Sequence, residues 1–155
     1  MKQTPEEIKT LTNFEPGKIS KDGFLGNDTR HIHDIIKSDI FTLHRLGVTQ
    51  DEIANRLQFF IDKGKESIEN KVDSGDFTVK ILWSKGMLPC PFGEPELHYK
   101  IVTTLLNKKL KKEITYSQLN VHLIREHGFF EGKGSVFRLE PEEVVKILNI
   151  KGVKK

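Results

Sequence analysis

The sequence predicts an α+β fold, with an N-terminal helical arm packed on a small, mostly antiparallel sheet and two C-terminal helices. Apolar residues recur at helical spacing up to about residue 72, alternate like a strand from residue 77, and return to helical spacing after residue 116. A chain of 155 residues matches one domain of average size. We therefore expect a single domain over 1–155, with a helical part (1–72) and an α+β part (73–155).

The helical part opens with a start signal, since Thr4 can cap a helix that has Pro5 at its first position. The stretch 13–28 is rich in glycine and lacks periodicity, so it is expected to be a loop. The next helix is predicted over 34–46, where apolar residues share one face and Gly47 can form the C-terminal cap.

A capping box at Thr49 and Glu52 begins the longest predicted helix, whose apolar stripe extends to Val72. Gly64 lies on that stripe, which leaves open either close packing at this position or a break in the helix. The run at 73–76, Asp-Ser-Gly-Asp, ends the helical part.

The second half contains the strands. Residues 77–82 alternate as a strand does, and the Pro-Cys-Pro-Phe-Gly run at 89–93 is typical of a turn. Segments 99–106 and 113–116 are predicted to form a hairpin, whose lysine-rich tip would keep the sheet edge in solution.

A helix is predicted from a capping box at Thr115 to His127, with Gly128 at its C-terminal cap. A glycine-rich loop follows it. The pattern then predicts a short strand at 136–139 and a last helix at 141–149, which begins with a proline.

Charge and composition narrow the function. The net charge is +3, and residues 98–155 hold 12 Lys and Arg against 6 Asp and Glu, which favours an anionic partner. The absence of a long apolar run and the single cysteine lead us to expect a cytoplasmic protein with no membrane span. Our first hypothesis is a non-enzymatic binding or regulatory module for a phosphate-containing ligand or nucleic acid, leaving oligomeric state open.

The loop 128–135, Gly-Phe-Phe-Glu-Gly-Lys-Gly-Ser, is the first candidate site for such a partner. It is not a P-loop, because Gly134 separates the lysine from the serine and the helix precedes the loop. Successive glycine amides beside cationic side chains can still hold a phosphate or a carboxylate. The predicted ligand-binding residues are Arg125, Lys133, Ser135 and Arg138.

A metal centre is the second candidate. The pattern Leu-x-x-His122-x4-His127 resembles the helical half of a two-cysteine, two-histidine zinc finger, although Gly93 stands where the second cysteine of a finger would be. The nearest replacement donor is His98, and zinc accepts one thiolate and three imidazoles. The alternative hypothesis is therefore a metal-supported or cysteine–histidine enzyme, with zinc as cofactor and Cys90 as candidate nucleophile. Its residues are Cys90, His98, His122 and His127.

Helical geometry argues against convergence of the two histidines. At about 100° per residue, His122 and His127 are about 140° apart around the axis. We expect His127 to face the apolar side and His122 to lie at the surface.

Two weaker patterns compete elsewhere. His31 and His33 could chelate a metal if their segment were extended, but a helix start is the preferred interpretation. Residues 43–57 resemble the first helix and turn of helix-turn-helix regulators, yet no second turn or basic recognition helix follows. A helical hairpin of the core is therefore preferred there.

Overall fold

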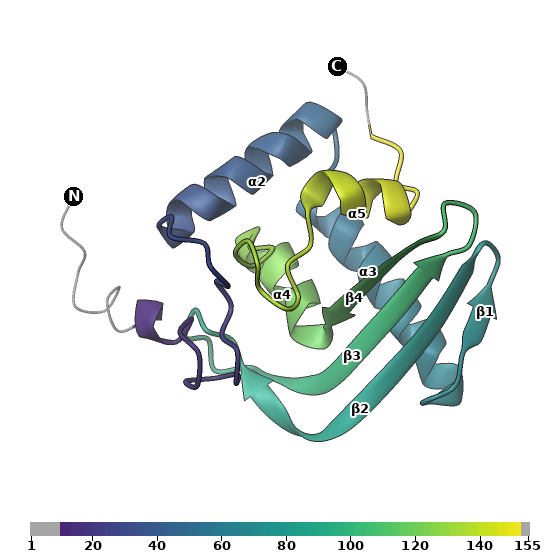
Figure 1. The fold of residues 1–155 in the computed structure, drawn as a ribbon, viewed down its shortest axis with the longest axis horizontal. Helices are drawn as coiled ribbons and strands as arrows, with labels where there is room; N and C mark the ends of the chain where they lie inside the picture. Colours follow the sequence, from purple (N-terminus) through teal and green to yellow (C-terminus); the bar gives the residue numbers. More distant parts are fainter. Residues whose placement is uncertain (1–9, 153–155) are drawn as a thin grey trace.

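The computed structural model describes residues 10–152 and confirms the α+β class (Figure 1). Most of the helix predicted from Thr4 lies outside the described residues. Residues 10–12, which begin the described range, are helical. No helix of the described part is long and apolar enough to cross a membrane. In chain order the elements are α2 (Ile32–Leu46), α3 (Gln50–Gly64), the 3₁₀ helix η1 (Lys65–Ser67), β1 (Val72–Ser74), β2 (Phe77–Pro89), β3 (Leu97–Asn107), β4 (Lys112–Ser117), α4 (Gln118–His127) and α5 (Pro141–Ile147).

The four strands form one antiparallel sheet in the order β1-β2-β3-β4. Helices α3 and α4 pack against each other and against the sheet, and α2 and α5 lie toward the top of Figure 1. Along β2 the residues Phe77, Val79 and Ile81 are buried, whereas the alternating Lys80 and Leu82 are exposed. The predicted alternation is therefore confirmed, with one face of β2 toward the helices.

The signals at the ends of α2 and α3 are confirmed. Gly47 ends α2 in the left-handed conformation, with φ of 70°, which favours glycine. Thr49 and Glu52 form the predicted capping box, in which the hydroxyl accepts from the amide of Glu52 and the carboxylate accepts from the amide of Thr49.

The helix predicted to run to Val72 is shorter, since α3 ends at Gly64. Gly64 packs directly on the side chain of Ile81 in β2, where an added Cβ would collide with it. Val72 instead belongs to β1, which pairs with β2 through a hairpin whose last pair is Ser74 and Phe77. Of the two interpretations left open for Gly64, both close packing and a helix end are observed.

Two predictions near α4 are wrong. The capping box lies at Ser117 and Asn120, because Thr115 is still paired with Thr104 in the sheet and its backbone cannot begin a helix. The strand predicted at 136–139 is a turn region, since the amide of Arg138 donates to the carbonyl of Ser135 instead of joining the sheet.

The buried apolar residues form two clusters. The larger fills the space between the sheet and helices α3, α4 and α5. The smaller gathers aromatic side chains beneath the N-terminal segment, around Phe14, Phe24 and Phe129, and includes Cys90.

The N-terminal segment meets the loop after α4 backbone to backbone. The amide of Gly132 donates to the carbonyl of Phe24 over 2.8 Å, and the amide of Asn27 donates to that of Lys133 over 3.0 Å. A Cβ added at Gly26 or Gly132 would collide with the main chain opposite. We call this contact of residues 24–28 with 132–135 the glycine seam.

Candidate metal centre

The connection between β2 and β3 forms a tight turn at Cys90. The carbonyl of Cys90 accepts from the amide of Gly93 over 3.0 Å, and Gly93 has a φ of 92°, which favours glycine. The turn folds Glu94 back toward the cysteine, so that Cys90 Sγ lies 3.3 Å from Glu94 Oε1. A thiol and a carboxylate therefore face the same space.

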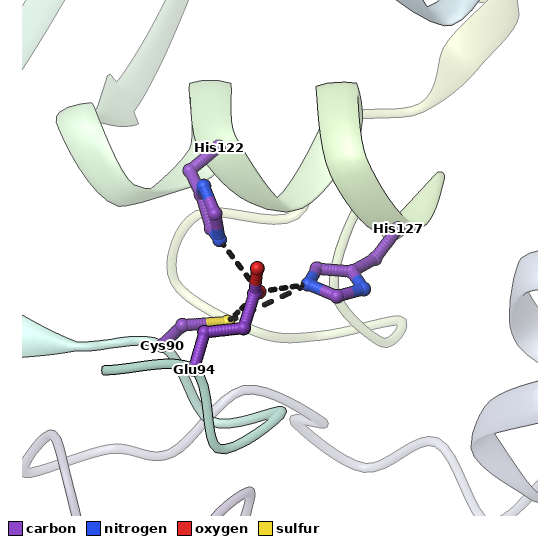
Figure 2. A group of neighbouring side chains, drawn as sticks. All are labelled: Cys90, Glu94, His122 and His127. Atoms are coloured by element: carbon purple, nitrogen blue, oxygen red, sulfur yellow. Dashed lines mark hydrogen bonds and ion pairs between the residues drawn. The ribbon is translucent and has the colours of Figure 1, made fainter. Parts of the chain in front are cut away.

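Helix α4 contributes two histidines to that space (Figure 2). His122 Nε2 lies 2.9 Å and His127 Nε2 lies 2.5 Å from the same oxygen, Oε1 of Glu94. The expectation that the two rings would not converge is wrong. Glu94, which the turn brings opposite α4, lies within reach of both the His122 ring and the His127 ring. Their exposure is also the reverse of the prediction, with His122 at 10% and His127 at 21%.

Four candidate donor atoms thus lie within 4.8 Å of one another, from Cys90, Glu94, His122 and His127. Cys90 Sγ and His127 Nε2 are 3.7 Å apart. A tetrahedral zinc ion bonded to sulfur at about 2.3 Å and to nitrogen at about 2.0 Å holds those atoms about 3.5 Å apart. The sulfur–nitrogen distance is therefore close to that of a metal site.

The electrostatics of the cluster are strongly coupled. Hydrogen bonds from His127, and next from His122, lower the pKa of Glu94 to about 2 despite its partial burial. Burial, with a smaller contribution from Glu94, raises the pKa of the Cys90 thiol to about 12. Without a cation, Cys90 is therefore a neutral thiol beside an ionised carboxylate.

Aromatic rings close one side of the cluster. Phe92 stacks on the His127 imidazole, with ring centroids 4.0 Å apart and planes 16° apart. Phe14 packs edge-on against Phe92 and against Phe129, which follows α4. The cluster consequently borders the smaller hydrophobic core.

A second group of donors adjoins the first through His122. It contains Glu96, His98 and His122, and the rings of the two histidines are 4.3 Å apart. His98 is only 8% exposed, and its Nε2 has no hydrogen-bond partner among the described residues. Such a buried, unsatisfied nitrogen is uncommon in folded proteins and marks a place where a ligand can bind.

The four residues predicted to bind an anion all make hydrogen bonds within the protein. Arg125 donates from α4 to Asn55 on α3, and the Ser135 hydroxyl donates to Glu131. Arg138 forms a buried ion pair with Asp39, with side-chain exposures of 7% and 6%. The backbone amide of Lys133 donates to Asp28. Much of the donor capacity of this region is thus directed at the protein's own acids.

Glu131 is a buried carboxyl group that the sequence did not single out as functional. It is 2% exposed and accepts from Asn120 Nδ2 over 2.7 Å and from Ser135 Oγ over 2.6 Å. Burial raises the pKa of Glu131 to about 7, against the opposing effect of these hydrogen bonds.

The weaker sequence patterns have structural roles. His31 caps α2, its Nδ1 accepting from the amide of His33, and the two rings stack 4.9 Å apart. No group of three metal-binding side chains includes either histidine in the part of the chain that the structure describes. Helix α3 is followed by η1 and a strand instead of a recognition helix.

Sequence reasoning brought Cys90, His122 and His127 into one set, and the structure places these three together. It missed Glu94 and gave its place to His98. The available signal was the Cys-Pro-Phe-Gly-Glu run, since a glycine at the end of a tight turn returns the next side chain toward the first. A glutamate was not expected among the ligands, because the zinc-finger pattern contains only cysteine and histidine.

Comparisons of the chain with models of protein families, with curated proteins and with solved structures found no match. Inference about function therefore depends on the geometry of the site.

Proposed function

We propose that the protein binds a zinc ion through Cys90, Glu94, His122 and His127, and that the ion fastens the β2–β3 turn to helix α4. The observation that carries this proposal is the convergence of the four donors within 4.8 Å, from two segments of the chain. One sulfur, two imidazole nitrogens and one carboxylate oxygen are a donor set that zinc accepts.

The crowding around Glu94 supports a cation at this position. Three groups, the thiol and both imidazoles, lie within 3.3 Å of the single oxygen Oε1. A carboxylate oxygen has about two lone-pair directions, so three good hydrogen bonds to one oxygen are not available. A cation among the four atoms resolves this crowding, because all four would then act as donors to the metal.

The surroundings favour a structural ion over a catalytic one. Four protein donors complete a tetrahedron, whereas catalytic zinc keeps one position open for water or substrate. Cys90 is 1% exposed, and Phe92 covers the His127 ring. The raised pKa of Cys90 also argues against the cysteine-nucleophile alternative, which requires a thiolate at neutral pH.

Elemental analysis of protein purified without a histidine tag tests the proposal. We expect about one zinc ion per chain after reconstitution, and a lower Tm after chelation, because an ion that binds only the folded state stabilises it. Cys90→Ser and His127→Ala should lose the ion, while the matched control His44→Ala, which removes an exposed histidine of α2, should keep it.

Less than about 0.2 zinc ions per chain after reconstitution, with no change in Tm on chelation, would overturn the proposal. Retention of a full equivalent by Cys90→Ser together with loss in His44→Ala would place the ion elsewhere. Circular dichroism of each variant shows whether loss of the ion follows from loss of the fold.

A further inference from the structure

A second surface lies on β2 and β3, on strand residues that precede and follow the Cys90 turn. Trp83 and Tyr99 lie side by side there, with ring centroids 5.1 Å apart and an interplanar angle of 63°. Their exposed fractions are 39% and 51%, and the β2 residues from Leu82 to Met87 are exposed as well. We call the shallow hollow that they line with Ser84, Lys85, Gly86 and Met87 the Trp83 surface.

Local geometry explains why these rings are uncovered. The pairing of β2 with β3 is irregular between Ser84 and Met87, and Gly86 has a φ of 93°. An irregularity of this kind bends a strand and turns side chains away from the packed face. Helix α3 ends at Gly64, which packs on Ile81 of β2. Trp83 is two residues further along β2, so the helix does not cover it.

The rim of the Trp83 surface is basic. Lys85 and Lys100 are exposed, and neither has a carboxylate within ion-pair distance among residues 10–152. The Lys65 ammonium lies 5.6 Å from the Trp83 ring and also pairs with Asp62. The exposed aromatic pair is thus bordered by two lysines, Lys85 and Lys100, that form no ion pair with any residue in the described range 10–152.

From this arrangement we propose that the Trp83 surface binds single-stranded nucleic acid. Unpaired bases stack on exposed aromatic rings, and lysines beside the rings neutralise the phosphates that connect the bases. A duplex keeps its bases stacked inside, so it cannot use the rings in this way. The proposal is independent of the metal ion, whose donors lie elsewhere.

The lysine-rich tip of the β3–β4 hairpin is a competing position for an anionic partner. The lysine-rich tip of the β3–β4 hairpin holds Lys108 and Lys109, both exposed, but carries no aromatic side chain. Charge alone would attract a nucleic acid to that tip, whereas stacking is available only at the Trp83 surface. The two positions can therefore be separated by substitution.

Trp83 is the only tryptophan of the chain, so it reports binding without a label. The intact protein is titrated with oligouridine and, in a second arm, with oligothymidine of about 15 nucleotides, and the quenching of tryptophan fluorescence is followed. Quenching by both arms is expected for stacking alone. A preference for oligouridine would identify RNA, through contacts to the 2′-hydroxyl.

Two variants test the named groups. Tyr99→Ala keeps the Trp83 reporter and should weaken binding by about tenfold, the loss expected for one stacked base. The double variant Lys85→Ala, Lys100→Ala should lower the slope of log K against log salt by about 1.4, since each phosphate contact on a single strand contributes about 0.7. The matched control is Lys108→Ala, Lys109→Ala, which removes the same charge from the hairpin tip and should change neither the quenching nor the affinity at high salt.

Several results would overturn the proposal. These are no quenching at about millimolar oligonucleotide, equal binding of duplex and single strand, or loss of binding in the hairpin-tip variant. Equal quenching by heparin would show that charge alone is recognised, and quenching by anionic lipid vesicles but not by oligonucleotides would assign the surface to membranes. Circular dichroism of Tyr99→Ala guards against a folding defect, and Tyr99→Phe, which keeps the ring, should restore binding.

Discussion

The thiol of Cys90 and the imidazole of His127 lie 3.7 Å apart although 37 positions separate them in the chain. One belongs to a turn between strands and the other to the last residue of a helix. Any ion held by both therefore closes a loop of the chain, and such a closure stabilises the folded state by restricting the unfolded one.

His98 is expected to act as a reserve ligand when Glu94 is removed. Its Nε2 has no hydrogen-bond partner within residues 10–152, and its ring lies against that of His122. Glu94→Ala should therefore keep one metal ion at reduced affinity, using the set Cys90, His98, His122 and His127. Cobalt(II) absorption checks this, since the intensity of the visible bands distinguishes four-coordinate from six-coordinate metal.

The double variant Glu94→Ala, His98→Ala supplies the control for the reserve ligand. It should weaken cobalt or zinc binding by more than about 100-fold relative to wild type, because even second-shell losses cost 10–100-fold. If His98→Ala has no effect in the Glu94→Ala background, His98 does not take the vacant position.

Zinc affinity should rise with pH. Because the pKa of Cys90 is raised to about 12, the thiol is protonated at neutral pH and the metal must displace its proton. The apparent Kd should then fall about tenfold per pH unit between pH 7 and 8, because one thiol proton is displaced for each ion bound. Competition titrations with a chromophoric chelator measure the slope.

A pH-independent Kd in that interval would show that the thiolate is not a ligand. The variant Cys90→Ser gives the comparison, since any remaining affinity should lose most of its pH dependence. Proton release measured in weakly buffered solution gives an independent count of protons displaced.

The buried carboxyl of Glu131 should make the protein less stable as pH rises. Its pKa is raised from an ordinary value of 4.5 to about 7, so between these values the folded state holds a proton that the unfolded state has released. The stabilisation is complete below about pH 4.5 and is lost as pH rises through 7. It amounts to on the order of 3 kcal/mol, since one pKa unit corresponds to about 1.4 kcal/mol.

Urea unfolding of Glu131→Gln at several pH values isolates this effect. The difference in unfolding free energy between the variant and wild type should shift in favour of the variant as pH rises from 5 to 8. The neighbouring Arg138 keeps its charge from pH 5 to 8, so it adds little to the pH dependence of this free-energy difference. Glu126→Gln, at an exposed position of α4, should show no such shift, and a flat difference for Glu131→Gln would refute the assignment.

Removal of one partner of the Arg138–Asp39 ion pair should lower the stability of the protein. Both side chains are almost fully buried, and the two guanidinium nitrogens contact both carboxylate oxygens. Asp39→Ala leaves the buried guanidinium with the half-exposed Glu140 as its one remaining carboxylate partner among residues 10–152, so the unfolding free energy should fall by up to about 3–5 kcal/mol. Denaturant titration gives the value.

A surface pair offers the control for this measurement. Arg45 and Glu142 are about half exposed and 3.3 Å apart, so Glu142→Ala should change stability by less than about 1 kcal/mol. Equal effects of the two substitutions would show that burial does not determine the strength of the Arg138 pair.

Local signals allowed much of the fold to be predicted. Gly47 and Gly128 both adopt the left-handed conformation that ends a helix, and the hairpin of β3 and β4 forms as its alternation indicates. These features depend on residues near one another in sequence. The wrong predictions concern positions at which residues distant in sequence determine the structure. At Gly64, for example, the end of the helix packs on Ile81 of β2.

The candidate site was predicted in part for the same reason. Residue chemistry suggested Cys90, His122 and His127, but helical geometry alone suggested that the histidines diverge. Their convergence depends on Glu94, whose position is set by a turn in another part of the chain. A helical wheel contains no information about what lies opposite the helix.

The glycine seam restricts how this sequence can change over evolutionary time. At Gly26 and Gly132 the obstacle is main chain, which every amino acid carries, so no substitution on the opposite side can make room. Saturation mutagenesis should therefore find both positions intolerant of every replacement. We expect any homologue that keeps this contact to retain both glycines, whatever the rest of its sequence.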